Sequence, residues 1–133
     1  MFKVMILIRR KPGMRKEDFI AYYEDKHAPL GARSVPNIKR YVRHFLHSYG
    51  NDVYAAAAEP PYDVATELWF DDEEDFKRGM AYLTEPETAR IIGEDEEKLF
   101  DKSSIRFLIM EDHETDMTAL NAEEQRRRSR AAT

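Results

Sequence analysis

The chain has 133 residues, 42% of them hydrophobic and 11% aromatic, a size that predicts one domain with a single core. Its 26 acidic and 21 basic residues give a net charge of -5, which argues against a protein that coats nucleic acid. The sequence contains no cysteine, which excludes disulfides, thiolate nucleophiles and cysteine metal sites and makes a reducing cytoplasm the expected location.

An apolar run opens the chain at residues 2–8. Its side chains are apolar in both alternating sets of positions, with Val4, Ile6 and Ile8 in one set and Met5 and Leu7 in the other. A strand of this kind usually has both faces covered. The run is too short to span a bilayer and lacks the features of a signal peptide, so we expect a buried strand and no membrane association.

A helix around residues 19–27 follows. Phe19, Tyr23 and His27 recur every fourth residue, which places them on one helical face. Pro29 disfavours helical geometry at the residue before it, so we expect the helix to end or kink just after His27. The dipole of a helix ending there would support a proton on the imidazole.

Two strands and a long loop make up the middle of the chain. Residues 40–48 and 64–70 both alternate in the manner of strands. The segment 48–63 between them is too polar, and too broken by glycine and proline, for a regular element. Its tyrosines favour a lid, and a flexible surface loop is the alternative.

The second half predicts two helical segments, residues 72–83 and 85–100, that act as one connection. The second begins with a capping box and a proline at residues 84–87. Residues 104–110 predict a last strand with both faces apolar. From there the pattern fades, and we assign residues 1–113 to the domain and 114–133 to a polar, flexible tail.

This order of elements predicts a ferredoxin-like α+β fold, βαββαβ, with a four-stranded antiparallel sheet and helices on one face. The other face would be bare, although the first and last strands are apolar on both sides. A second copy packed face to face would cover it, so we expect a homodimer with a barrel-like centre. The alternative is that the long loop or the tail folds back over that face.

Several segments resemble the EthD-domain family. They are Arg9-Arg10-Lys11-Pro12-Gly13, the pattern from Phe19 through Tyr22, Tyr23 and His27 to Ala28-Pro29-Leu30, Val35-Pro36-x-Ile38 before Tyr41-Val42, and Glu67-Leu68-Trp69-Phe70-Asp71. The resemblance spans residues 2 to about 113 and implies a dimeric α+β barrel. The relatives it implies have several chemistries: an ether-degradation accessory protein, polyketide dehydratases and decarboxylases, and more distant isomerases, oxygenases and haem enzymes.

His27 is the candidate catalytic acid/base, because an imidazole exchanges protons near neutral pH and the resemblance implies that this histidine lines the family's pocket. A structural histidine at a helix end is the alternative. Glu67, held against Trp69 in an apolar cavity, would have a raised pKa and would assist. Its alternative role is an ion pair with an arginine such as Arg43. The resemblance also favours Tyr41 as a catalytic residue.

Further candidates for substrate binding are Tyr23, Trp69, His44 and Phe19. Tyr41 and His44 lie on opposite faces of their strand, so at most one of them shares a pocket with Glu67. A metal site built on His44 and His47 is disfavoured, because positions i and i+3 of a strand point to opposite faces. Nothing local supports haem, and we expect no cofactor.

We expect cofactor-free acid/base chemistry of the isomerase or lyase type: dehydration, decarboxylation or isomerisation of a small hydrophobic carbonyl or aromatic metabolite. The pocket is expected to close when two subunits meet. One alternative is cofactor-free oxygenation of an electron-rich aromatic, an oxidoreductase activity that would need access for dioxygen. The other is a non-catalytic accessory protein that binds a metabolite of a degradation pathway.

Overall fold

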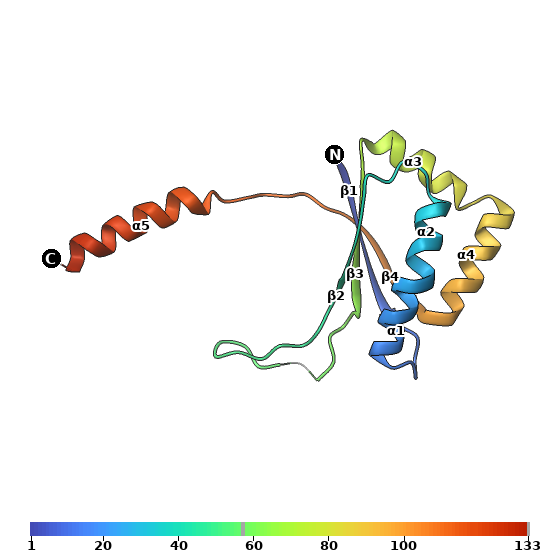
Figure 1. Cartoon of the computed structure of the whole chain (residues 1–133), viewed down its shortest axis with the longest axis horizontal. Coiled ribbons are helices and arrows are strands. Elements are labelled where there is room, and N and C mark those ends of the chain that lie inside the picture. Colours follow the sequence, from blue (N-terminus) through green and yellow to red (C-terminus); the bar gives the residue numbers. More distant parts are fainter. Residues whose placement is uncertain (57, 133) are drawn as a thin grey trace.

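The computed structural model describes residues 1–56 and 58–132 and contains one antiparallel sheet with helices packed on one side (Figure 1). The elements are β1 (Phe2–Arg10), α1 (Lys16–Tyr22), the π-helical segment η1 (Tyr23–His27), α2 (Ala28–Ser34), β2 (Arg40–Phe45), β3 (Val64–Phe70), α3 (Glu73–Tyr82), α4 (Pro86–Leu99), β4 (Phe100–Ile109) and α5 (Met117–Ala132). The strand order is β2-β3-β1-β4. This order confirms the predicted ferredoxin-like α+β fold.

The register of the sheet assigns each strand residue to one of two faces. Leu68 of β3 lies opposite Val4 of β1 and Tyr41 of β2, and these side chains point toward the helices. We call this side the helix face. The intervening positions, such as Glu67 opposite Met5, point away from the helices, and we call that side the open face.

The core lies between the helix face and α1, η1, α2 and α4. Phe19, Val64 and Leu99 have no exposed surface, and Tyr23 is 2% exposed. The aromatic rings pack edge to face, with the ring centroids of Phe19 and Tyr23 5.9 Å apart. In β1, in β3 and in the first helix, the residues that sequence spacing assigns to one common face are therefore the residues that lie in the core.

Of the two predicted outcomes, an end or a kink just after His27, the helix does not end there, but its regular α-helical geometry is interrupted by the π-helical segment η1. The segments α1, η1 and α2 continue with helical dihedral angles, and Pro29 lies in the first turn of α2. In an α-helix the proline ring would clash with the carbonyl four residues earlier. A wider turn avoids this clash, because the Ala28 N–H bonds to the Tyr23 carbonyl five residues back. No helix C-terminus acts on His27.

The helices of the second half begin as their acidic residues suggest. The Asp72 side chain accepts a hydrogen bond from the Asp75 N–H at the start of α3. At α4 the capping side chain is Glu85, which accepts from the Thr88 N–H, rather than Thr84. The last strand starts at Phe100, four residues earlier than predicted, because an irregularity in the β1–β4 register extends the pairing.

Two segments project from the body on the side of the open face (Figure 1). One is the loop between β2 and β3, whose residues 46–56 we call the arm; Ala57, in the alanine-rich part of this loop, lies outside the described residues. The other is α5, a helix where the sequence predicted a flexible tail, and α5 buries none of its residues. The assignment of 114–133 as a separate tail stays a prediction. In residues 1–56 and 58–132 no helix has the length and apolar character needed to cross a membrane.

Candidate active site

A cavity of about 220 Å³ lies between the helix face and the helices. Apolar side chains from β1, β3, β4, α3, α4 and the segment between α2 and β2 form most of its wall, and five residues contribute polar groups: Tyr23, His27, Tyr41, Thr66 and Glu96. An apolar cavity with a few converging polar groups is typical of small-molecule sites. The lining residues named here all belong to one chain, and closure of the pocket by a second subunit stays a prediction.

His27 enters this cavity from η1 and is 7% exposed. Its Nδ1 atom lies 2.8 Å from Oδ2 of Asp95, on α4. The ring lies edge-on to Phe100, with centroids 4.9 Å apart, and to Tyr23, at 5.3 Å. A carboxylate at Nδ1 fixes the neutral ring with its proton on Nδ1, so that Nε2 is left as the basic nitrogen.

The Nε2 atom of His27 remains accessible. Within the described part of the chain, Trp69 Nε1 is the single fully shielded side-chain nitrogen or oxygen that has no hydrogen-bond partner. No hydrogen bond joins His27 Nε2 to another of these residues, so this atom keeps some accessible surface on a side chain that lines the cavity. The basic nitrogen can therefore meet a bound molecule.

Asp95 is itself held from two sides. Its second oxygen accepts a hydrogen bond of 2.5 Å from the Tyr22 hydroxyl, and Asp95 is 9% exposed. Burial, followed by the contact with Asp95, raises the pKa of Tyr22 to about 12. Tyr22 is therefore a hydrogen-bond donor at neutral pH, and both carboxylate oxygens of Asp95 are satisfied.

Two phenols and a threonine form the polar part of the sheet side. The Tyr23 hydroxyl and Thr66 Oγ1 are 2.7 Å apart. Tyr41 reaches the same cavity from β2, and a Cβ atom on Gly31 would lie 3.2 Å from its hydroxyl. Burial is the main cause that raises the pKa of both tyrosines. Both phenols stay protonated at neutral pH and can donate to a substrate oxygen.

Glu96 adds a carboxyl group to the same wall. Burial raises its pKa, against the opposing effects of the charges on His27 and Lys102. Sequence reasoning missed both Asp95 and Glu96, because the run Glu94-Asp95-Glu96-Glu97 has the composition of a solvated helix face. The available signal was position: Asp95 lies four residues before Leu99, on the buried side of α4.

Three predicted site residues lie on the open face, away from His27. Glu67 pairs across the sheet with Met5, and its Oε2 is 3.6 Å from Nε2 of His44. The Trp69 ring lies near Lys3 and Arg40 on the same face. The prediction that Glu67, Trp69 and His44 share a pocket with His27 is therefore corrected. The helices cover the opposite face of β3, which is formed by the residues that alternate with Glu67 and Trp69.

Tyr23 and Tyr41 line the same cavity as His27, as predicted, but Phe19 does not line it. Phe19 is fully buried and packs edge-on against Tyr23 without lining the cavity. It supports a wall residue from behind. The alternative ion pair proposed for Glu67 is also wrong, because Arg43 binds Glu24, with Nε 2.8 Å from the Glu24 carboxylate.

The predicted lid does not cover this cavity. The described residues of the loop between β2 and β3 contribute nothing to its wall, and the arm projects on the opposite side of the sheet (Figure 1). In the described ranges 1–56 and 58–132 no three histidine, aspartate or glutamate side chains are grouped so as to hold a metal ion.

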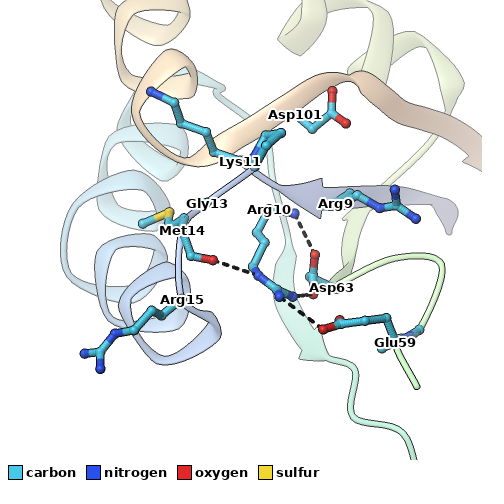
Figure 2. A pocket seen from close by; sticks show the side chains of 11 residues that line it. Arg9, Arg10, Lys11, Gly13, Met14, Arg15, Glu59, Asp63 and Asp101 are labelled. Carbon is cyan, nitrogen blue, oxygen red and sulfur yellow. Dashed lines mark hydrogen bonds and ion pairs between the residues drawn. The ribbon is translucent and has the colours of Figure 1, made fainter. Parts of the chain in front are cut away.

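A second depression, of about 550 Å³, lies between the end of β1 and the part of the β2–β3 loop that leads into β3 (Figure 2). Its cationic side chains point in different directions, with Lys11 and Arg15 turned away from Arg9. Arg10 is occupied by Asp63, with Nη1 2.5 Å from Oδ1, and by the Met14 carbonyl at 2.9 Å. Cationic side chains that point in different directions do not form an anion site. We interpret this depression as a structural contact between β1 and the loop.

Comparisons with known proteins agree with this architecture. A sequence model of the EthD domain matches residues 11–103. An EthD family protein from Bacillus halodurans is 22% identical, with 85% of this chain and 100% of that chain covered and a TM-score of 0.57. An EthD-like protein from Ralstonia eutropha is 21% identical, with 82% and 86% covered and a TM-score of 0.53. HapK from Hahella chejuensis is 14% identical, with 86% and 95% covered and a TM-score of 0.57. A search of curated proteins found no match.

Proposed function

The chain belongs to the EthD-domain family, and on that premise we propose that it is an enzyme of the isomerase or lyase type that moves protons on a small hydrophobic carbonyl or aromatic metabolite without a cofactor. One observation carries the proposal. His27 is held by Asp95 through Nδ1 and exposes Nε2 to an apolar cavity. The cavity volume of about 220 Å³ is below the roughly 300–1,000 Å³ of sites for drug-sized ligands, which favours a smaller molecule.

In the first step Nε2 of His27 takes a proton from the carbon next to a carbonyl group. The electron pair of the broken C–H bond forms the enolate, whose negative charge develops on the carbonyl oxygen. The protonated phenol of Tyr41 donates to that oxygen, which stabilises the enolate. The carboxylate of Asp95 stabilises the imidazolium that forms.

The second step decides the class of reaction. Return of the proton from His27 to a different carbon gives an isomer. Loss of a β-hydroxyl from the enolate, with a proton supplied by the carboxyl group of Glu96, gives water and an unsaturated product. Burial raises the pKa of Glu96, which favours the protonated form needed for this role.

We also propose that the protein is a homodimer in the cytoplasm. The open face carries apolar side chains that helices leave uncovered, among them Met5, Val42, Trp69 and Leu108. Leu108 is 46% exposed in the single chain. A second open face packed against the first would bury these side chains, and the cysteine-free sequence suits a reducing compartment.

The direct test follows proton transfer rather than a guessed product. The protein is incubated in D₂O with a panel of small cyclic ketones, 1,3-diketones and phenols, and NMR measures deuterium uptake at the carbon next to the carbonyl group or at the ring. We expect catalysed uptake with at least one compound, and a loss of at least about 10²-fold in the His27→Gln variant. Uptake that is unchanged in this variant would refute the role of His27.

The same panel separates the alternatives. Consumption of dioxygen that depends on protein and substrate would indicate the oxygenase. Binding of a compound, measured by calorimetry, without deuterium uptake or turnover would indicate the accessory binding protein. In that case His27→Gln leaves the affinity nearly unchanged, because no transition state is stabilised.

A further inference from the structure

The arm exposes three large apolar side chains at its outer end. Tyr49, Val53 and Tyr54 are 84%, 75% and 73% exposed. Single exposed apolar residues are common on protein surfaces, but three within six residues on a projecting segment form a patch that favours contact with another protein. The arm carries this patch away from the body on the side of the open face (Figure 1).

The outer end of the arm is a folded turn. The Asn51 side-chain oxygen accepts hydrogen bonds from the Val53 and Tyr54 N–H groups, both at 2.9 Å. The Asn51 N–H donates to the Tyr54 carbonyl at 2.8 Å. A Cβ atom on Gly50 would lie 3.0 Å from the Ala56 nitrogen, so glycine allows the outgoing and returning parts of the arm to touch. The patch is therefore presented on a defined scaffold.

Hydrogen bonds also hold the base of the arm. Leu46 N–H donates to the Asp63 carbonyl, and the Asp63 N–H donates to the Ile8 carbonyl, each at 2.9 Å. The buried carboxylate of Asp63 binds the backbone and the guanidinium of Arg10 (Figure 2). The ammonium group of Lys16 donates to the Leu46 carbonyl. These contacts set the direction of the arm, and the arm does not fold back over its own sheet.

We propose that the arm packs against a second copy of this chain and locks the dimer from its edge. The inference rests on the proposed packing of two open faces. Two sheets packed face to face lie about 10 Å apart. The stretch from residue 46 to 51 spans up to roughly 17 Å when extended, so the arm is long enough for the turn at its end to reach the plane of the other sheet. Each arm then places Tyr49, Val53 and Tyr54 against its partner.

The test compares two variants that lose exposed apolar side chains. One is the triple variant Tyr49→Ser, Val53→Ser, Tyr54→Ser; the control is Tyr82→Ser, because Tyr82 is 57% exposed on α3, on the helix side. Sedimentation velocity over a dilution series gives the dimer dissociation constant. We expect the triple variant to raise this constant at least tenfold and the control to leave it unchanged. An unchanged constant in the triple variant overturns the proposal.

A second measurement maps the contact directly. The chain has no cysteine, so Tyr54→Cys and Tyr82→Cys each provide one site for a benzophenone photo-crosslinker. Irradiation should give a covalent dimer from position 54 and none from position 82. Crosslinks from position 54 that stay within one chain overturn the arm contact while the dimer stands. A monomeric wild-type protein at micromolar concentration overturns the dimer and the arm together, and the deuterium uptake assay still tests the chemistry.

Discussion

A single imidazole has its two nitrogens in different surroundings, and this difference carries the chemistry. On one side His27 Nδ1 meets a buried carboxylate that is also bonded to Tyr22. On the other side Nε2 meets an apolar cavity. The carboxylate fixes the tautomer, while the cavity keeps bulk water from competing for the base.

Asp95→Asn tests this arrangement at the scale of one atom. The asparagine amide can donate to Nδ1, which favours the tautomer with the proton on Nε2 and removes the base. We expect deuterium uptake to fall by about 10²–10⁴-fold with little change in fold, as measured by NMR and circular dichroism. Glu94→Gln, an exposed neighbour, is the control. Full activity in Asp95→Asn would show that the contact is only structural.

The buried setting of Glu96 predicts that the free energy of unfolding depends on pH. Burial raises its pKa above the ordinary value near 4.5, so the folded protein holds this proton more tightly than the unfolded chain. Its contribution to the free energy of unfolding is therefore present below pH 4.5 and is lost as the pH rises through the folded pKa.

Glu96→Gln is neutral at every pH and avoids this loss. We expect the difference in Tm, variant minus wild type, to grow as the pH rises from 4.5 to 8, measured by thermal unfolding in a series of buffers. Glu114, whose side chain is exposed and far from Glu96 in the sequence, replaced in the same way, should give a flat difference. A flat difference for Glu96→Gln would contradict the buried setting.

At the scale of elements, a π turn and the helix after it position the site. The π turn lets the chain continue through Pro29, and α2 then runs past β2 closely enough that a Cβ atom at position 31 would lie 3.2 Å from the Tyr41 hydroxyl. Local sequence signalled an irregularity at Pro29, but proline preferences do not distinguish a helix end from a wider turn. The packing of both flanking helical segments on the sheet decides between them.

Gly31→Ala tests the contact between α2 and β2. Alanine gains up to about 1 kcal/mol in helix propensity, but its Cβ would lie 3.2 Å from the Tyr41 hydroxyl and displace it. We expect a Tm that is equal or higher and deuterium uptake that is about tenfold lower, a separation that general destabilisation would not produce. In a Tyr41→Phe background the same substitution should have little further effect on uptake. A full additional loss there would place the cause elsewhere.

At the scale of the whole molecule, the order of elements was enough to predict a four-stranded antiparallel sheet with all its helices on one face. The four-residue spacing of Phe19, Tyr23 and His27 also placed the histidine beside its true neighbours. The error at Glu67 has a physical reason: alternation shows which residues share a face, but not which face the helices cover. Asp95 was missed because its role depends on a contact between residues 68 positions apart.

Leu108→Glu tests the proposed dimer. Leu108 lies opposite Met5 on the open face and is already 46% exposed, so a charge there is tolerated by the single chain but not in a packed interface. We expect a monomer by light scattering, with unchanged helix content. Ile91→Glu, at a site 39% exposed on α4, is the control and should stay dimeric. A dimeric Leu108→Glu variant would place the interface on another surface.

The sheet separates the cavity on one side from the proposed contact surface on the other. We therefore expect the two cavities of a dimer to work independently, so that a mixed pair of intact and His27-substituted chains has half the rate of the intact pair. Changes of substrate and changes of assembly fall on different residues of the same strands, which alternate along the chain. Substitutions that change which ligand the cavity binds can therefore leave the contact between two subunits unchanged.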